Sequence, residues 1–263
     1  AVVFKPAEDV PHTATVFVEA LLEAGLPPQV IQLVHGTGEA VGSAIVEHAG
    51  VALVSFTGST ETGRIVGETC GRMHKRLSLE MGGKNAMIVL DDGDIDLALE
   101  GVLWGAFGTT GQRCTPSSRL ILQTGIHDEF LSRLIDRARS LKLGDGRKAG
   151  TDVGPLIHES ALEKVERYVD IGQAEGAELM CSGRRPDGRG LKNGHFFEPT
   201  IFARVHPGSR LEQEEIFGPV LSVVRVQSAD EAFRINNGVK YGLSSSLYTR
   251  DVHVAFRALN DLD

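Results

Sequence analysis

The sequence has few cysteines and no cluster of them. Cys70, Cys114 and Cys181 lie far apart in a chain of 263 residues, and no Cys-x-x-Cys pair occurs. This spacing argues against a zinc site and against a disulfide framework, and it is typical of a reducing compartment such as the cytoplasm. Each cysteine is therefore either a small buried hydrophobe, which is the commoner case, or a reactive thiol. We expect no bound metal.

Long apolar runs and basic clusters are also missing. No apolar run reaches the roughly 18 residues that a membrane helix needs. The opening residues Ala1–Phe4 run directly into Lys5-Pro6, so we expect no signal peptide. The net charge of −8 repels polyanions, and the basic residues form no cluster with interleaved aromatic residues. The sequence therefore predicts neither a membrane nor a nucleic acid as a partner.

The residues that are present predict an α/β protein. Hydrophobic residues make up 41% of the chain and charged residues 24%, which is ordinary for a globular protein. Short apolar strands alternate with amphipathic helices, a rhythm that indicates parallel sheets. The rhythm repeats after residue 80, which favours two α/β units joined near that point. The expected strands are 2–4, 30–34, 51–56, 77–80, 86–90, 119–123, 178–181 and 196–202, and the expected helices are 15–24, 39–47, 60–74, 94–107, 128–141 and 160–175.

Two glycine-containing segments in the first unit are candidates for binding phosphate. Residues 35–42 have the spacing Gly-x-Gly-x-x-x-Gly, which is one residue too long for a dinucleotide fingerprint, so a tight turn into a helix is favoured. Residues 56–63 are more informative, because a strand ends there and a helix begins just after Gly58 and Ser59. Unpaired N–H groups at such a helix start attract phosphate, although a serine cap can be purely structural.

Two further segments carry candidate catalytic groups. Glu80 ends an apolar strand beside Gly82-Gly83, so partial desolvation would raise the pKa of its carboxyl group toward the range useful to a general base. The alternative is an ordinary glutamate in an ion pair or facing solvent. Cys114 lies on a polar loop next to Arg113, a setting that favours the thiolate. The alternative is a cysteine without a catalytic role.

Taken together, these segments resemble the aldehyde dehydrogenase superfamily. The Glu-Met-Gly-Gly-Lys segment that begins at Glu80 and the Gly-Gln-Arg-Cys segment that ends at Cys114 make the resemblance specific, and it extends over essentially the whole chain. It implies part of a Rossmann-like, parallel, NAD-binding domain in residues 1–80 and part of a second, catalytic α/β domain in residues 81–263. The matching segments are Lys5–Glu8, Phe56–Gly63, Leu79–Asn85, Gly111–Cys114 and Glu214–Pro219.

The resemblance also implies a cofactor and the residues that hold it. In the family, a lysine and a glutamate at the positions of Lys5 and Glu8 contact the adenosine ribose. A carboxylate accepts bonds from both ribose hydroxyls and repels a 2′-phosphate, so Glu8 favours NAD over NADP. The pyrophosphate is expected at Gly58 and Ser59. The nicotinamide ribose is expected at Glu215, with Phe217 packed nearby.

The implied reaction is oxidation of a small aldehyde to a carboxylic acid. Cys114 attacks the aldehyde carbon to give a thiohemiacetal, loss of hydride leaves a thioester, and Glu80 activates the water that hydrolyses it. Pro116, two residues past the cysteine, departs from the small residue usual in the family, and we expect altered local shape rather than lost chemistry. Arg113 and residues 241–246 resemble semialdehyde-oxidising members, although Arg113 as an ordinary surface cation is slightly favoured.

Two expectations concern the whole protein. The family's oxyanion-binding asparagine would precede residue 1, and its oligomerisation strand would follow residue 263. We therefore expect a fragment with little or no activity alone, from a protein that forms a homo-oligomer. Two alternatives stay open: a cysteine hydrolase or thioester-forming transferase, which needs no NAD, and a non-catalytic member of the fold. Aldehyde-dependent reduction of NAD separates the first alternative from the dehydrogenase.

Overall fold

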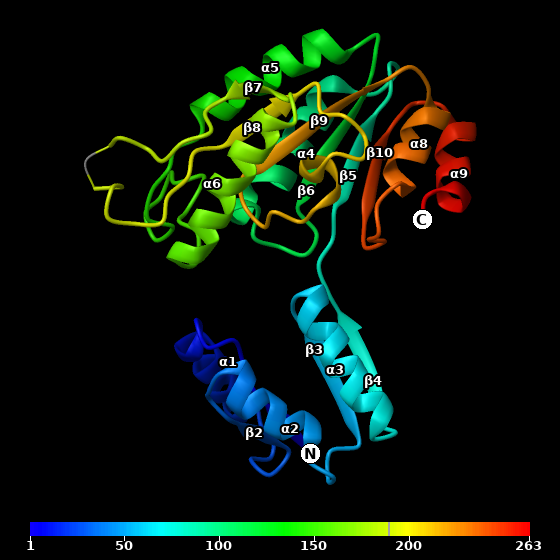
Figure 1. The fold of residues 1–263 in the computed structure, drawn as a ribbon. Helices are drawn as coiled ribbons and strands as arrows, with labels where there is room; N and C mark the ends of the chain where they lie inside the picture. The colour runs from blue at the N-terminus through cyan, green and yellow to red at the C-terminus, as the bar shows by residue number, and fades with distance from the viewer. Residues whose placement is uncertain (189) are drawn as a thin grey trace. The chain divides into compact units, whose positions relative to one another are not determined.

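The computed structural model describes residues 1–188 and 190–263. They form two compact units, Ala1–Met81 (unit 1) and Gly82–Asp263 (unit 2). Both are mixed α/β structures built on parallel strands (Figure 1), which confirms the predicted fold class. In the described residues, no helix is both long enough and apolar enough to cross a membrane.

Unit 1 consists of two strand–helix–strand motifs, each with a pair of parallel strands. Helix α1 joins β1 to β2, and α3 joins β3 to β4. A small core of Val54, Val66 and Cys70 lies between α3 and its strands. The elements are β1 (Val2–Phe4), α1 (Pro11–Glu23), β2 (Ile31–Leu33), the π-helix η1 (Gly38–Gly42), α2 (Ser43–Glu47), β3 (Leu53–Thr57), α3 (Thr60–Arg72) and β4 (Arg76–Glu80).

Unit 2 is built on one six-stranded sheet in the order β10-β5-β6-β9-β8-β7. All neighbouring strands are parallel except β7, which runs antiparallel to β8. The strands are β5 (Asn85–Val89), β6 (Ser117–Gln123), β7 (Glu178–Cys181), β8 (Thr200–Ala203), β9 (Val220–Val226) and β10 (Ser245–Tyr248). The helices are α4 (Ile95–Phe107), the 3-10 helix η2 (Gly108–Gly111), α5 (His127–Ser140), α6 (Glu159–Ala174), α7 (Arg210–Gln213), α8 (Ala229–Asn237) and α9 (Val252–Asp261).

Helices cover both faces of the unit 2 sheet, which explains why its central strands are almost continuously apolar. Met87 and Val89 of β5 pack with α4 and α5, whereas Ala86 and Ile88 pack with α6 and α8. All five residues of β5 are buried. Successive side chains of β5 point to opposite faces of the sheet, so the strand contributes apolar residues to two separate hydrophobic cores.

Several elements differ from the sequence-based prediction in their bounds or type, among them β2, β3 and α3 by one or two residues, and three differ more. Helix α1 begins at Pro11 rather than residue 15, because proline is well suited to the first turn of a helix. Strand β8 begins at Thr200 rather than residue 196, after Pro199, which lacks the N–H that a sheet strand needs. Residues 38–42 form a π-helix capped by Thr37 instead of the predicted start of an α-helix.

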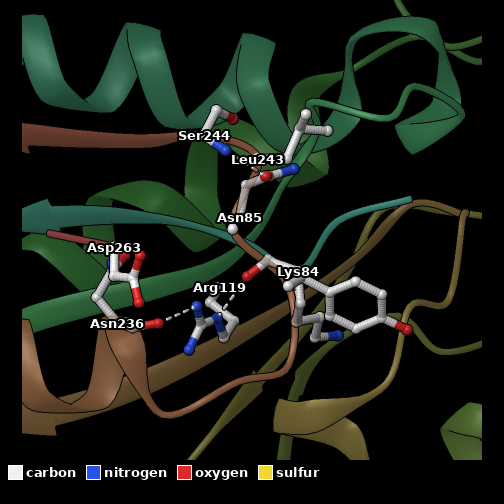
Figure 2. A pocket seen from close by; sticks show the side chains of 9 residues that line it. Lys84, Asn85, Arg119, Asn236, Leu243, Ser244 and Asp263 are labelled. Atoms are coloured by element: carbon white, nitrogen blue, oxygen red, sulfur yellow. Dashed lines mark hydrogen bonds between the residues drawn. The ribbon is translucent and has the colours of Figure 1, made fainter. Parts of the chain in front are cut away.

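A buried ion pair joins four segments of unit 2. The guanidinium of Arg119 donates to Glu212 Oε1 at 2.7 Å, and both side chains are almost inaccessible to solvent. Three further N–H groups donate to the carbonyls of Lys84 at 2.8 Å, Ile235 at 2.8 Å and Asn236 at 2.9 Å, as Figure 2 shows for Lys84 and Asn236. Arg119 therefore ties β6 to the start of β5, to α7 and to the carbonyl end of α8.

Removing the negative member of this pair should be costly. We expect Glu212→Gln to lower the free energy of unfolding by about 3–5 kcal/mol, because it leaves a buried guanidinium without its counter-charge. Urea denaturation measures the change. The matched control is Glu100→Gln, which breaks the exposed pair with Arg137 (2.6 Å) and should cost about 0–1 kcal/mol. Equal small losses in the two variants would contradict a structural role for the buried pair.

Candidate active site

A strained turn delivers Cys114 to the surface of unit 2. Thr109, Thr110 and Gly111 all have positive φ, at 54°, 59° and 68°, a region that side-chain-bearing residues rarely adopt. The buried Thr110 hydroxyl donates to the carbonyl of Gly154 at 3.1 Å, which helps to hold the turn. Position 111 requires glycine for two reasons: its positive φ, and its close packing, since a Cβ there would lie 2.2 Å from the Gly218 carbonyl oxygen. The turn leaves the Cys114 residue exposed.

Two amide side chains hold the loop on either side of the cysteine. Before it, Gln112 accepts from the Ile157 N–H at 2.9 Å. After it, Asn85 donates to the carbonyl of Cys114 at 2.8 Å and to that of Pro116 at 3.1 Å. Neither amide was predicted from the sequence to have a role. The available signal was a polar asparagine placed at the start of an otherwise apolar strand.

Arg113 contacts a helix rather than open solvent. Its guanidinium stacks on the Trp104 ring, 3.8 Å from the ring centroid, and donates to the carbonyls of Trp104 at 3.2 Å and Gly105 at 3.4 Å. These carbonyls belong to the last turns of α4, where a cation is favourable. The structure therefore gives Arg113 a role at the end of α4 and does not support its use as a receptor for a substrate carboxylate.

Glu215 lies directly against the two glycines that follow Met81. Its Oε1 accepts from the Gly83 N–H at 3.1 Å, and a Cβ on Gly82 would lie 2.2 Å from its Oε2. Only glycine permits this approach. Phe217 has a positive φ of 61° and is 39% exposed, so it is not an ordinary core residue.

Unit 2 thus brings several predicted and unpredicted residues to one edge of its sheet. The loop of Cys114 precedes β6, Gly82 and Gly83 precede β5, and Glu215 precedes β9. Because these central strands are parallel and adjacent, the segments that lead into them meet at the same edge.

Gly58 and Ser59 immediately precede α3 in unit 1, with Ser59 at the N-cap position. The Ser59 hydroxyl accepts from the Thr62 N–H at 3.1 Å, so it caps the helix. A Cβ on Gly58 would lie 2.5 Å from the Phe56 ring, and the Gly58 N–H donates to the Glu80 carbonyl at 3.0 Å. The helix start and the end of β4 are therefore joined.

Glu80 is exposed in this chain, in contrast to the partial desolvation that we predicted. The reason is that, among the described residues, β4 pairs with β3 and with no other strand, and its residues alternate between exposed and half-buried, with Arg76, Ser78 and Glu80 on the exposed face. An apolar strand at a sheet edge does not bury the face on which its last residue lies.

Lys5 and Glu8 follow β1 and form an ion pair of 2.9 Å. The hydrogen bond from Lys5 holds the pKa of the Glu8 carboxyl below its ordinary value. Glu8 is therefore a carboxylate near neutral pH, which is the form that accepts hydrogen bonds from ribose hydroxyls.

Lys84 is a buried lysine that the sequence analysis did not single out. Its side chain is 1% exposed, and its Nζ has no hydrogen-bond partner among the described residues. Burial and, to a lesser extent, the nearby Arg119 lower its pKa from 10.5 to about 7, whereas Glu212 and Glu215 oppose the shift. In the described ranges no group of three His, Cys, Asp or Glu side chains is arranged to hold a metal ion.

Comparison with known proteins gives one consistent result. The sequence model described as the aldehyde dehydrogenase family matches residues 1–263. The alpha-ketoglutaric semialdehyde dehydrogenase of Bacillus subtilis is 40% identical over 262 residues, which are 100% of this chain and 54% of that protein. The D-glyceraldehyde dehydrogenase (NADP(+)) of Picrophilus torridus is 41% identical and is matched by 98% of this chain over 52% of its own length.

Solved structures agree with the sequence comparisons. The betaine aldehyde dehydrogenase of Staphylococcus aureus, in complex with NAD+, has a TM-score of 0.96 and 39% identity to this chain. The match covers 100% of this chain and 52% of that structure. The chain spans about half the length of the curated relatives it matches.

The buried Lys84 predicts a rise in stability with pH. Its pKa is about 7 when folded and near 10.5 when unfolded, so the unfolded chain binds more protons between these values. The free energy of unfolding should therefore increase across this window, by up to about 1.4 kcal/mol per pH unit. Lys84→Met should remove this contribution and stabilise the chain more at pH 7 than at pH 9. Urea denaturation at both pH values tests this, with the exposed Lys148→Met as control; identical pH dependence in wild type and Lys84→Met would contradict it.

Proposed function

The chain belongs to the aldehyde dehydrogenase family, and from that premise we propose that the whole protein oxidises an aldehyde to a carboxylic acid with NAD. Cys114 is the proposed nucleophile and Glu80 the proposed general base. The observation that carries the proposal is the exposed Cys114 on a loop held by Asn85 and Gln112, at the same sheet edge as Glu215. A thiol on such a loop is both accessible and fixed in position.

The thiolate of Cys114 forms a bond from Sγ to the aldehyde carbon, and the carbonyl electron pair moves to oxygen. The N–H of Cys114 is the proposed donor that stabilises that oxyanion. When NAD is bound it supplies the hydride acceptor. Collapse of the oxyanion with loss of hydride leaves a thioester on Sγ. Water then attacks the thioester, Glu80 takes its proton, and the Cys114 thiolate leaves as the acid is released.

Residues of both units suit the parts of NAD. The ionised Glu8 suits ribose hydroxyls, the Ser59-capped start of α3 suits a pyrophosphate, and the carboxylate of Glu215 suits the second ribose. Glu8 repels a 2′-phosphate, so we infer NAD rather than NADP, although the Picrophilus relative is named for NADP(+). The residues proposed to hold the cofactor are Lys5, Glu8, Gly58, Ser59, Glu215 and Phe217.

On this proposal residues 1–80 are part of the NAD-binding domain and residues 81–263 part of the catalytic domain. The proposed substrate is a semialdehyde, supported by the name of the Bacillus relative and not by Arg113, whose guanidinium is engaged by α4. Testing succinic semialdehyde against betaine aldehyde separates an anionic from a cationic substrate. The free state of all three cysteines supports a cytoplasmic location, and the family resemblance supports a homo-oligomer.

The nucleophile is tested by Cys114→Ala in the whole protein. We expect aldehyde-dependent NADH formation to disappear while NAD binding, measured by fluorescence titration, is retained. Cys181→Ala is the matched control, because that thiol is buried in the unit 2 core, and it should keep its activity. NADH formation by Cys114→Ala at the wild-type rate would overturn the assignment.

The general base is tested by Glu80→Gln. Steady-state turnover should fall roughly 10²–10⁴-fold, the usual worth of a positioned base. A first turnover of NADH should remain, because hydride loss precedes hydrolysis of the thioester. Stopped-flow absorbance measures both phases, and the exposed Glu68→Gln on α3 serves as control. An unchanged steady-state rate in Glu80→Gln would show that another group activates the water.

A further inference from the structure

Asn85 makes three hydrogen bonds, two of them to the loop that carries Cys114. Asn85 is buried, with 4% of its surface exposed. Its Nδ2 donates to the carbonyls of Cys114 at 2.8 Å and Pro116 at 3.1 Å, and its Oδ1 accepts from the Ser244 N–H at 3.1 Å. A flipped amide would set its oxygen against two carbonyl oxygens, so the contacts themselves fix its orientation.

The two carbonyls that Asn85 binds lie on either side of Thr115. The bond to the Cys114 carbonyl fixes the plane of the peptide group between Cys114 and Thr115. Pro116 has no N–H, so it cannot hold this part of the loop through a backbone donor of its own. Gln112 holds the approach to the cysteine through Ile157. Asn85 is thus the anchor on the far side of the nucleophile.

Gly83 leaves the space that this anchor needs. A Cβ at position 83 would lie 2.8 Å from Asn85 Oδ1 and 2.9 Å from the Cys114 carbonyl oxygen. The N–H of the same glycine donates to Glu215. One short segment, residues 83–85, therefore holds both the cysteine loop and the proposed cofactor carboxylate.

The third bond of Asn85 extends the anchor to the loop that leads into β10. Ser244 lies in residues 241–246, the segment whose role the sequence analysis left open, and Figure 2 shows Asn85 and Ser244 side by side. Strand β10 pairs with β5 from Ser245 onward. Residues 241–246 therefore hold the Asn85 side chain, which in turn holds the backbone at Cys114.

We propose that Asn85 is a positioning residue for Cys114, holding the backbone beyond the cysteine so that its Sγ and N–H keep the geometry required for attack on the aldehyde. This inference rests on the proposed role of Cys114. Asparagine suits the position because it offers two donors and one acceptor at once. Serine offers one donor, alanine none, and an ionised aspartate places negative oxygen against both carbonyls.

The first experiment follows the NADH burst in the whole protein by stopped flow. The burst rate constant, which reports attack and hydride loss, should be highest in the wild type. It should then decrease from Asn85→Ser to Asn85→Ala to Asn85→Asp. For Asn85→Ala we expect a loss on the order of 10–100-fold, the effect of a small misplacement of a reacting group. The KM for NAD should not change, because no cofactor contact is removed. This split between burst rate and KM distinguishes positioning from general loss of structure.

The matched control is Gln123→Ala. Gln123 is also an amide that accepts a backbone N–H, from Asp91 at 3.0 Å, and donates to a carbonyl, that of Gln227 at 3.3 Å, but it lies at the opposite end of β6. Gln123→Ala should keep the wild-type burst rate. A wild-type burst rate in Asn85→Ala, or an equal slowing in Gln123→Ala, would overturn the proposal.

A second measurement needs neither aldehyde nor NAD. Hydrogen exchange of the peptide containing residues 112–118 should be faster in Asn85→Ala than in wild type or Gln123→Ala, because the loop loses its anchor. Unchanged exchange overturns the proposal whatever the activity. If the loop exchanges faster but the wild-type protein makes no NADH, the anchor is supported and the proposed function fails.

Discussion

A guanidinium is costly to bury unless its nitrogens donate to acceptors and its charge is paired, and this constraint governs unit 2. Arg119 meets it with the Glu212 carboxylate and three main-chain carbonyls. Those acceptors come from the segment before β5, from α7 and from the end of α8. The hydrogen bonds of Arg119 therefore fix the position of α7 and of the segment that follows Gly82-Gly83 and leads into β5. Glu215 follows α7 and reaches Gly83 as a result.

The cysteine loop depends on a different balance. Thr109 and Thr110, which both have positive φ, store conformational strain, and such strain persists only when surrounding contacts determine the conformation. The Thr110 hydroxyl, the close fit of Gly111 on Gly218 and the amides of Gln112 and Asn85 are those contacts. An accessible thiol is thus combined with a fixed backbone, which is the combination that nucleophilic catalysis uses.

Local patterns predicted the fold well, and long-range contacts explain what they could not predict. The α/β alternation follows from apolar periodicity, and the motif segments were visible because each is contiguous. The bond from Gly83 to Glu215 joins residues 132 positions apart, and that from Ser244 to Asn85 joins residues 159 apart. A local sequence pattern does not predict hydrogen bonds between residues so far apart in the chain. The exposure of Glu80 was mispredicted because it depends on β4 lying at an edge, which its own apolar sequence does not reveal.

In the proposed reaction, the aldehyde carbon becomes covalently attached to the sulfur of Cys114. Acid quenching of the whole protein during turnover with aldehyde and NAD, followed by peptide mass spectrometry, tests it most directly. We expect an acyl group, with the mass of the aldehyde less one hydrogen, on the peptide that contains Cys114. We also expect a greater yield when hydrolysis is slowed by Glu80→Gln. Acylation of another residue, or rapid NADH formation without any acyl-enzyme in that variant, would contradict it.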